Sequence, residues 1–143
     1  MTRFFWDTNI FIYLFDAHGQ WNEAARNLRN SMKARGIELV TSVMTLGELQ
    51  VGAKKSGDEE MAARYKAALA RSATIVPFEE SAAGHYAELR AKTSVRGPDA
   101  LQLACAAAHG VEVFVTNDER LHKVRLATVH FVVPITVALQ LAG

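Results

Sequence analysis

The chain has 143 residues, enough for one compact domain, and half of them are apolar, which excludes a disordered or fibrous protein. Its 16 Lys and Arg residues nearly balance 15 Asp and Glu residues, for a formal net charge of +1, so a nucleic acid would have to bind at a local basic patch. The single Cys105 excludes an internal disulfide, and no apolar run is long enough to cross a membrane, so we expect a cytosolic protein.

Short apolar runs alternate with longer helix-like segments. In chain order they predict a strand over residues 3–6, helices over 9–15 and 22–35, a strand over 37–41, helices over 43–54 and 57–71, a strand over 74–78, helices over 79–92 and 97–110, strands over 111–116 and 130–133, and a helix over 134–141. Gly36 stands where a helix C-cap is expected, and Ser42 or Thr41 can cap the next helix. The alternation predicts an α/β fold with one domain over residues 1–143, whose mainly parallel five-stranded sheet is covered by helices on both faces.

Four acidic residues are predicted to meet at one edge of this sheet. Asp7 and Asp118 lie at the ends of the first and fourth predicted strands, and Asp99 opens the helix that leads to the fourth. Glu48 is the only charged residue in the segment 43–53, on the helix after the second strand. Parallel α/β sheets bind ligands at the carboxyl ends of their strands, where the strand order reverses. The four carboxylates therefore form a candidate site.

Each of these acids also has a purely structural interpretation. Asp99 follows Gly-Pro and is suited to cap a helix, while Asp7 and Asp118 can form turns or cap the helices after them. Thr45 and Glu48 have the spacing of a capping box. A capping carboxylate needs no other acid beside it, so it is the set of four that favours a functional site.

Converging carboxylates need a compensating positive charge. Two unit charges roughly 4 Å apart repel by about 4 kcal/mol at an effective dielectric constant of about 20, so four acids in one place either take up protons or bind cations. No His or Cys pattern with metal-ligand spacing accompanies them, which leaves oxygen ligands and favours Mg²⁺ or Mn²⁺ over Zn²⁺. The chemistry that such an ion favours is phosphodiester hydrolysis by a metal-activated water.

The four acids stand in segments that follow one another along nearly the whole chain. These read Phe5-Trp6-Asp7-Thr8-Asn9, Leu46-Gly47-Glu48-Leu49 followed by Gly52, Pro98-Asp99-Ala100-Leu101-Gln102-Leu103-Ala104, and Phe114-Val115-Thr116-Asn117-Asp118. In this order and spacing they resemble the PIN-domain family, and within it the VapC toxins of bacterial type II toxin–antitoxin systems.

The resemblance implies a metal-dependent endoribonuclease. The acidic quartet around Mg²⁺ or Mn²⁺ would be Asp7, Glu48, Asp99 and Asp118. Of these, Asp7 and Asp99 would bind the ion directly, and Asp118 directly or through a water.

The resemblance also assigns roles to the loop after the fourth strand and implies protein partners. Thr116 and Asn117 would shape this loop, with the Thr116 hydroxyl bonded to Asp7 or to a water on the metal. A homodimer is implied, together with a partner antitoxin whose C-terminal segment enters the acidic cleft.

An acidic site holds RNA only if basic residues flank it. The candidates near the quartet are Lys54, Lys55, Arg96, Arg120 and Lys123. The two lysines after the Glu48 helix can equally complement the end of that helix, so Arg96 and Arg120 are the stronger candidates for phosphate contact. RNA rather than DNA is implied by the resemblance alone.

Two further groups of residues could have a functional role as well as a purely structural one. Tyr13 and Trp21, with Phe11 and Leu14, can form an apolar groove or a dimer surface, and packing in the core is the simpler interpretation. Among the histidines, only His122 lies near the acidic loop in sequence.

Two alternative functions are weighed against the nuclease. A PIN-like module that binds RNA or a partner protein without cleaving is one, although a binding surface gains nothing from four mutually repelling acids. A phosphatase of the haloacid dehalogenase type is the other, but its chemistry needs a second Asp where this chain has Asn9.

Overall fold

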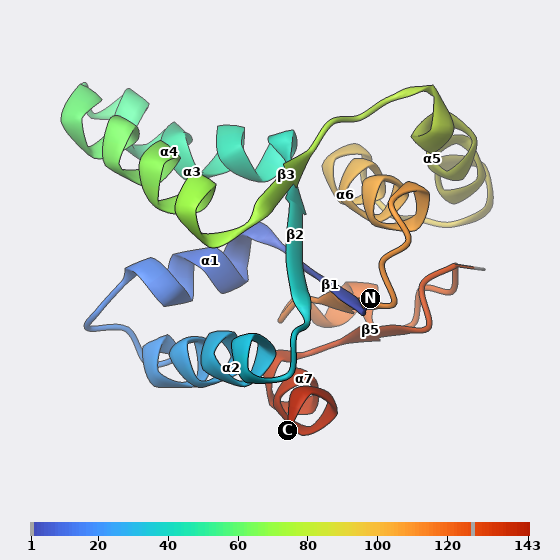
Figure 1. Cartoon of the computed structure of the whole chain (residues 1–143). Helices are drawn as coiled ribbons and strands as arrows, with labels where there is room; N and C mark the ends of the chain where they lie inside the picture. The colour runs from blue at the N-terminus through green and yellow to red at the C-terminus, as the bar shows by residue number, and fades with distance from the viewer. Residues whose placement is uncertain (1, 127) are drawn as a thin grey trace.

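The structure is a computed structural model and describes residues 2–126 and 128–143. A five-stranded sheet, whose strands all run parallel within the described residues, passes through its middle (Figure 1). The strands are β1 (Arg3–Trp6), β2 (Glu38–Ser42), β3 (Thr74–Val76), β4 (Val113–Val115) and β5 (Phe131–Val133). Their order across the sheet is β3-β2-β1-β4-β5, so β1 is the central strand.

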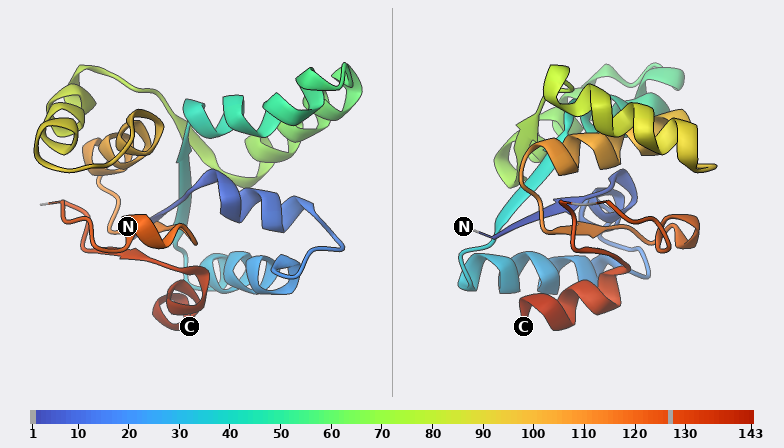
Figure 2. Two further views of the ribbon diagram at one scale, coloured as in Figure 1. Left: turned by 180° about the vertical axis from the view of Figure 1, so that it is seen from behind. Right: turned by 90° about the vertical axis from the view of Figure 1, so that its right-hand side faces the viewer.

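Helices cover both faces of this sheet. They are α1 (Thr8–Phe15), α2 (Asn22–Ala34), α3 (Val43–Lys55), α4 (Glu59–Ser72), α5 (Glu80–Lys92), α6 (Gly97–Ala108) and α7 (Ile135–Ala142). Seen from the side, α2 and α7 lie below the sheet and α5 and α6 above it (Figure 2). Within the described residues, no helix combines the length and the apolar character needed to cross a bilayer.

The side chains of the central strand alternate between two cores. Phe4 and Trp6 point to the face that α1, α2 and α7 cover, whereas Phe5 points to the face of α5 and α6 and stacks on Phe114 with ring centroids 4.9 Å apart. Because both faces of a parallel sheet are buried, consecutive residues of such a strand are all apolar. The aromatic run of β1 therefore specifies a central strand.

The strand order reverses beside β1. From β1 the chain continues to β2 and β3 on one side, and then returns to the other side of β1 to form β4. In the register, Phe5 lies opposite Val40 of β2 and opposite Phe114 of β4. The carboxyl ends of β1 and β4 are thus neighbours at the point where ligands bind in open α/β sheets.

The α/β fold and its five strands confirm the sequence prediction, and the sheet is wholly rather than mainly parallel in the described residues. Three predicted strands are too long, and the one expected over 130–133 begins one residue later, at Phe131. The strand expected over 111–116 begins at Val113, because the Val111 N–H bonds to the Ala106 carbonyl and so completes the end of α6. The strand expected over 74–78 ends before Pro77, which has no N–H for the sheet.

Gly36 ends α2 as the sequence predicts. It adopts a positive φ of 68°, its N–H bonds to the Lys33 carbonyl at 3.3 Å, and the Ile37 N–H bonds to the Met32 carbonyl at 2.9 Å. This is the Schellman arrangement, in which a left-handed residue turns the chain out of the helix. It aims the chain directly into β2.

Replacing Gly36 tests this turn. Gly36→Ala is expected to lower the free energy of unfolding by about 1 kcal/mol, because a Cβ disfavours the left-handed conformation. Gly84→Ala, a control in α5 with open space around the added methyl, is expected to raise it by roughly 0.5–1 kcal/mol. Urea unfolding measures both, and equal stability of Gly36→Ala and the wild type would contradict the account.

Candidate active site

Asp7 occupies the end of the central strand and is almost fully buried, with 7% of its surface exposed. Its backbone N–H bonds to the Val115 carbonyl at 2.9 Å, which continues the β1–β4 ladder. Its Oδ1 accepts the Thr8 N–H at 2.8 Å and so caps α1, while Oδ2 accepts the Thr116 hydroxyl at 2.8 Å. Both carboxylate oxygens are therefore fixed in place by the strand ends.

All hydrogen-bonding positions of the Thr116 hydroxyl are occupied. It donates to Asp7 and accepts two hydrogen bonds, from the Asp118 backbone N–H at 3.1 Å and from the Asn9 side-chain amide at 3.2 Å. A hydroxyl has one donor and two acceptor positions, so no further partner fits. The bond from Thr116 to Asp7 that the resemblance implied is thus present, and it ties the loop after β4 to the start of α1.

Asn117 fixes the next part of the same loop. Its side-chain oxygen accepts the Ile135 N–H at the start of α7 at 2.9 Å, and its own backbone N–H donates to the Asn9 side chain at 3.3 Å. The loop is therefore held between α1 and α7. This is a shaping role of the kind expected for Asn117.

Glu48 reaches the site through a buried polar network. The Thr8 hydroxyl donates to Glu48 Oε1 at 2.7 Å. Gln102 of α6 donates to the Thr45 hydroxyl at 2.7 Å and accepts the hydroxyl of Ser42. These contacts hold α3 and α6 against the residue that follows Asp7, so the positions of all these elements are coupled.

Sequence reasoning missed Thr8, Thr45 and Gln102 as site residues. A signal was present, since Thr45 precedes Glu48 and Asp99 precedes Gln102 by three positions, which places each pair on one helix face. The capping-box interpretation of Thr45 and Glu48 is wrong. The N-cap of α3 is Ser42, whose hydroxyl accepts the Met44 N–H at 3.1 Å.

Asp118 faces a cation on its own loop. Arg120 donates from Nε to Oδ1 at 2.9 Å and from Nη2 to Oδ2 at 2.6 Å, a two-point contact with both oxygens. Oδ1 also accepts the Arg120 backbone N–H at 3.1 Å, which caps the short 3₁₀ helix Glu119–Leu121. Asp7 and Asp118 thus both act as caps, as their structural interpretation proposed, and both lie at the same sheet edge.

The charges of the four acids act on one another. The pKa of Asp7 is raised to about 6, mainly by burial and to a smaller extent by the Asp99 and Glu48 carboxylates, against the lowering effect of the hydrogen bonds from Thr116 and Thr8. Burial also raises the pKa of Asp99, with a further contribution from Asp118. The structure therefore brings the quartet to one edge of the sheet, with Asp7 as its most deeply buried member.

Two arginines oppose this repulsion. The hydrogen bond from Arg120 is the main reason that the pKa of Asp118 is lowered, and the charge of Arg96 adds to it. Both guanidinium groups also act to lower the pKa of Asp99. Arg96, Asp99 and Arg120 line one small cavity of about 140 Å³.

The donor atoms fit a hard divalent cation in kind. They are carboxylate oxygens, which Mg²⁺ and Mn²⁺ prefer, and one of them belongs to a buried group whose negative charge is disfavoured. In residues 2–126 and 128–143, however, no three His, Cys, Asp or Glu side chains are arranged as ligands of a single ion. In this arrangement Asp118 is bound to Arg120, and Glu48 accepts the Thr8 hydroxyl.

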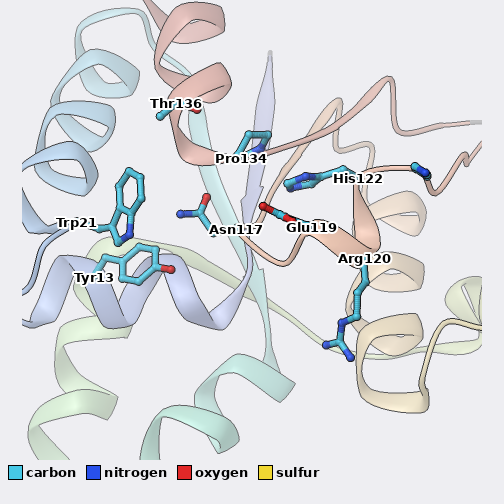
Figure 3. Close-up of a pocket in the computed structure, with 9 residues that line it drawn as sticks. Tyr13, Trp21, Asn117, Glu119, Arg120, His122, Pro134 and Thr136 are labelled. Carbon is cyan, nitrogen blue, oxygen red and sulfur yellow. The ribbon is translucent and has the colours of Figure 1, made fainter.

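A larger cleft of about 950 Å³ opens beside this edge (Figure 3). Asn117 and Arg120 line it together with Tyr13 and Trp21, so the core-packing interpretation is incomplete for these two half-buried aromatic residues, whereas Phe11 is fully buried. His122 lies in its wall.

The predicted RNA-contacting cations fall into two groups. Lys123 lines the larger cleft with Arg120, and Arg96 lies beside Asp99. Lys54 and Lys55 end α3, about 9 Å along the helix axis from Glu48, and Lys54 pairs with Glu59 at 2.6 Å. The structure brings the first group to the acidic edge and leaves the second farther away.

The fold and this site can be compared with known proteins. A family model described as the PIN domain matches residues 4–126. The chain belongs to the PIN-domain family. A comparison with curated proteins gave no match.

Several solved structures are similar to this chain. A chain of a DNA-bound VapBC complex from Salmonella typhimurium is 27% identical with a TM-score of 0.73, covering 93% of this chain and 98% of that one. A VapBC complex from Rickettsia felis, bound to a promoter DNA fragment, shares the fold at 21% identity and a TM-score of 0.74, covering 92% and 97%. A VapC toxin from Mycobacterium tuberculosis, described as cleaving the sarcin–ricin loop, shares it at 17% identity and a TM-score of 0.63, covering 78% and 86%.

The buried Asp7 predicts a pH dependence of stability in chelator. Its pKa is about 6 in the folded chain against an ordinary value of 3.8, so between these values the folded state holds a proton that the unfolded state has released. The stabilising contribution is complete below about pH 4 and is lost as the pH rises through 6, which amounts to about 3 kcal/mol. Asp7→Asn cannot ionise, so we expect it to gain about that much over the wild type between these limits in urea unfolding.

The control for this measurement is Glu60→Gln, which neutralises an exposed acid in the first turn of α4. Its stability should follow the wild-type pH profile. Identical profiles for the wild type and Asp7→Asn would show that the buried carboxylate does not titrate in this range.

Proposed function

We propose that this PIN domain is a metal-dependent endoribonuclease and the toxin of a type II toxin–antitoxin pair. The observation that carries the proposal is the buried Asp7 carboxylate at the reversal point of the sheet, whose pKa two other acids raise further. Membership of the PIN family and the similarity to chains of VapBC complexes support the toxin assignment.

In this proposal the quartet holds Mg²⁺ or Mn²⁺. Asp7 and Asp99 are direct ligands, Asp118 binds directly or through a water, and Glu48 completes the negative charge. Such an ion supplies an activated water and stabilises the charge that develops on the phosphate. Asp118 would take this part only if its carboxylate turned away from Arg120, which holds both of its oxygens in this structure.

The other residues position this machinery. The Thr116 hydroxyl holds the Asp7 carboxylate in one orientation, because its single proton is committed to Oδ2. Thr8 orients Glu48 through its hydroxyl, and Asn117 pins the loop that carries Asp118. Substitution of any of these three is expected to act on the geometry of the acids rather than on the chemistry itself.

The cations beside the acids hold the substrate. Arg96 and Arg120 line the same small cavity as Asp99, so both guanidinium groups are within reach of an RNA phosphate at the acids if Arg120 turns from Asp118. Lys123 extends the basic surface along the larger cleft. Lys54 and Lys55 remain predicted contacts for a longer RNA.

Two protein partners belong to the proposal. One is an antitoxin, whose C-terminal segment would enter the acidic cleft and block it. The other is a second copy of this chain, in a homodimer. Other solved structures similar to this chain are described as a toxin–antitoxin complex and as a member of the VapBC family of toxin–antitoxin systems, which supports the first of these partners.

Metal binding can be tested apart from activity. With Mg²⁺ or Mn²⁺ at about a hundred times its dissociation constant, the free energy of unfolding should rise by about 2.7 kcal/mol. Asp7→Asn and Asp99→Asn should largely remove this gain, whereas Glu60→Gln should keep it. Thermal melting with titrated metal measures the effect, and an unchanged wild-type melting temperature would count heavily against a metal site.

Cleavage itself is tested with purified protein and total cellular RNA. The wild type with Mg²⁺ or Mn²⁺ should produce discrete fragments, and either chelator or the substitution Asp7→Asn or Asp99→Asn should abolish them while circular dichroism remains unchanged. Sequencing the fragment ends identifies the cut. Nuclease activity that persists undiminished in the folded variants would refute the assignment of the site.

The same experiment separates the alternatives. A non-catalytic module would bind RNA or a partner protein and yield no fragments with any divalent ion. The phosphatase alternative lacks support, because the chain belongs to the PIN family and has Asn9 where that chemistry needs an acid.

A further inference from the structure

The cleft of about 950 Å³ beside the acidic edge has two chemically different walls (Figure 3). Tyr13 and Trp21 lie side by side on one of them, and His122 and Arg120 belong to the other, with Asn117 between. Since Asn117 stands between Thr116 and Asp118 in the chain, whatever occupies the cleft lies next to the candidate catalytic edge. None of the four acids lines the cleft, so the proposed metal site does not account for this cleft.

The aromatic wall is preformed. Tyr13 comes from α1 and Trp21 directly precedes α2, and their ring centroids are 6.0 Å apart with 33° between the planes. The buried Asn22 side chain donates to the carbonyls of Tyr13 and Leu14 at 3.0 and 3.1 Å, which fixes the segment carrying Trp21 to the end of α1. Two half-buried rings held by a buried amide offer apolar surface without a further loss of conformational entropy.

The opposite wall carries the charged side chains of the cleft. Arg120 belongs to it, with its guanidinium held by Asp118, and Lys123 and His122 lie beside it. The His122 ring nitrogen Nε2 lies 2.7 Å from the Thr116 carbonyl oxygen and is thereby held in place. Lys123 makes no ion pair within the part of the chain that the structure describes. Glu119 is the only acid among the residues that line the cleft.

We propose that this cleft binds an unpaired nucleotide of the RNA, with its base against Tyr13 and Trp21 and its phosphate toward Arg120 and Lys123. Aromatic rings paired with a basic groove are the recurring solution for binding single-stranded nucleic acid, because every base has a stacking face and every phosphate a charge. The inference rests on the proposed function for the identity of the ligand, and it adds which residues hold the base and the phosphate of one nucleotide beside the acidic edge.

A protein side chain is the competing occupant, and two observations favour the nucleotide. The cleft joins the acidic edge through the loop of Asn117 and Arg120, so a continuous strand can place one base in the cleft and the adjoining phosphate at the acids. Its volume also lies at the upper end of the range for small-ligand sites, which suits a base together with its sugar.

The experiment measures equilibrium binding in chelator, so that no RNA is cut. The probes are a fluorescein-labelled oligouridylate of about ten nucleotides, within the usual size of a single-strand site, and an RNA duplex of the same length. Trp21→Leu and Tyr13→Leu should each weaken binding of the single strand about tenfold and leave binding of the duplex unchanged. Trp21→Phe, which keeps a ring, should retain most of the single-strand affinity.

Two controls accompany these variants. Phe78→Leu removes an exposed aromatic ring beside Tyr86, away from this cleft, and should change neither affinity. Lys123→Gln should weaken both probes and reduce the slope of log affinity against log salt by about one, as expected for a lost phosphate contact.

A direct readout avoids reliance on the folding of the variants. Trp6 is fully buried, so a fluorescence change of the wild type on adding the oligouridylate reports on Trp21. An abasic ribose-phosphate oligomer of the same length should give no such change. An equal change with the abasic oligomer would overturn the proposal.

The outcomes distinguish this inference from the proposed function. If Asp7→Asn abolishes cleavage while Trp21→Leu and Tyr13→Leu leave single-strand binding unchanged, the nuclease stands and the nucleotide cleft is wrong. If no RNA is ever cut but the ring variants lose single-strand binding selectively, the cleft stands without the catalytic assignment. Equal effects on strand and duplex would also overturn the proposal, because a base that is already paired cannot enter the cleft.

Discussion

The burial of one carboxylate is the constraint on which the rest of the site depends. Asp7 ends the central strand, and burial is the largest effect on its pKa. The Thr8 N–H and the Thr116 hydroxyl each donate a hydrogen bond to it, yet the pKa stays raised because burial outweighs these bonds and the Asp99 and Glu48 charges add smaller contributions. Hydrogen bonds alone do not balance this charge, so the carboxylate either takes up a proton or binds a cation.

The pKa of Asp118, at the same edge of the sheet, is shifted in the opposite direction. Arg120 holds both of its oxygens, and its pKa is lowered, whereas that of Asp7 is raised. Two carboxylates on neighbouring strand ends thus have their pKa values pushed apart by burial and by a guanidinium.

The sequence predicted the elements of the fold well because their signals are local. The aromatic run before Asp7 specifies a strand buried on both faces, and Gly36 specifies a helix end. The position of the acids followed from a rule about strand ends. The network of Thr45 and Gln102 could not be predicted, since it depends on how α3 and α6 pack against each other. The pairing of Asp118 with Arg120 depends in the same way on side-chain conformation.

The strand order has a consequence for synthesis of the chain. Asp7 belongs to the first strand to be made, but the hydroxyl that orients it follows 109 positions later, and β1 lacks one of its two neighbours until β4 exists. Folding that proceeds from the N-terminus therefore leaves the carboxylates apart until the ribosome has released the fourth strand. An incomplete polypeptide therefore lacks the assembled acidic edge, which forms only in a late step of folding.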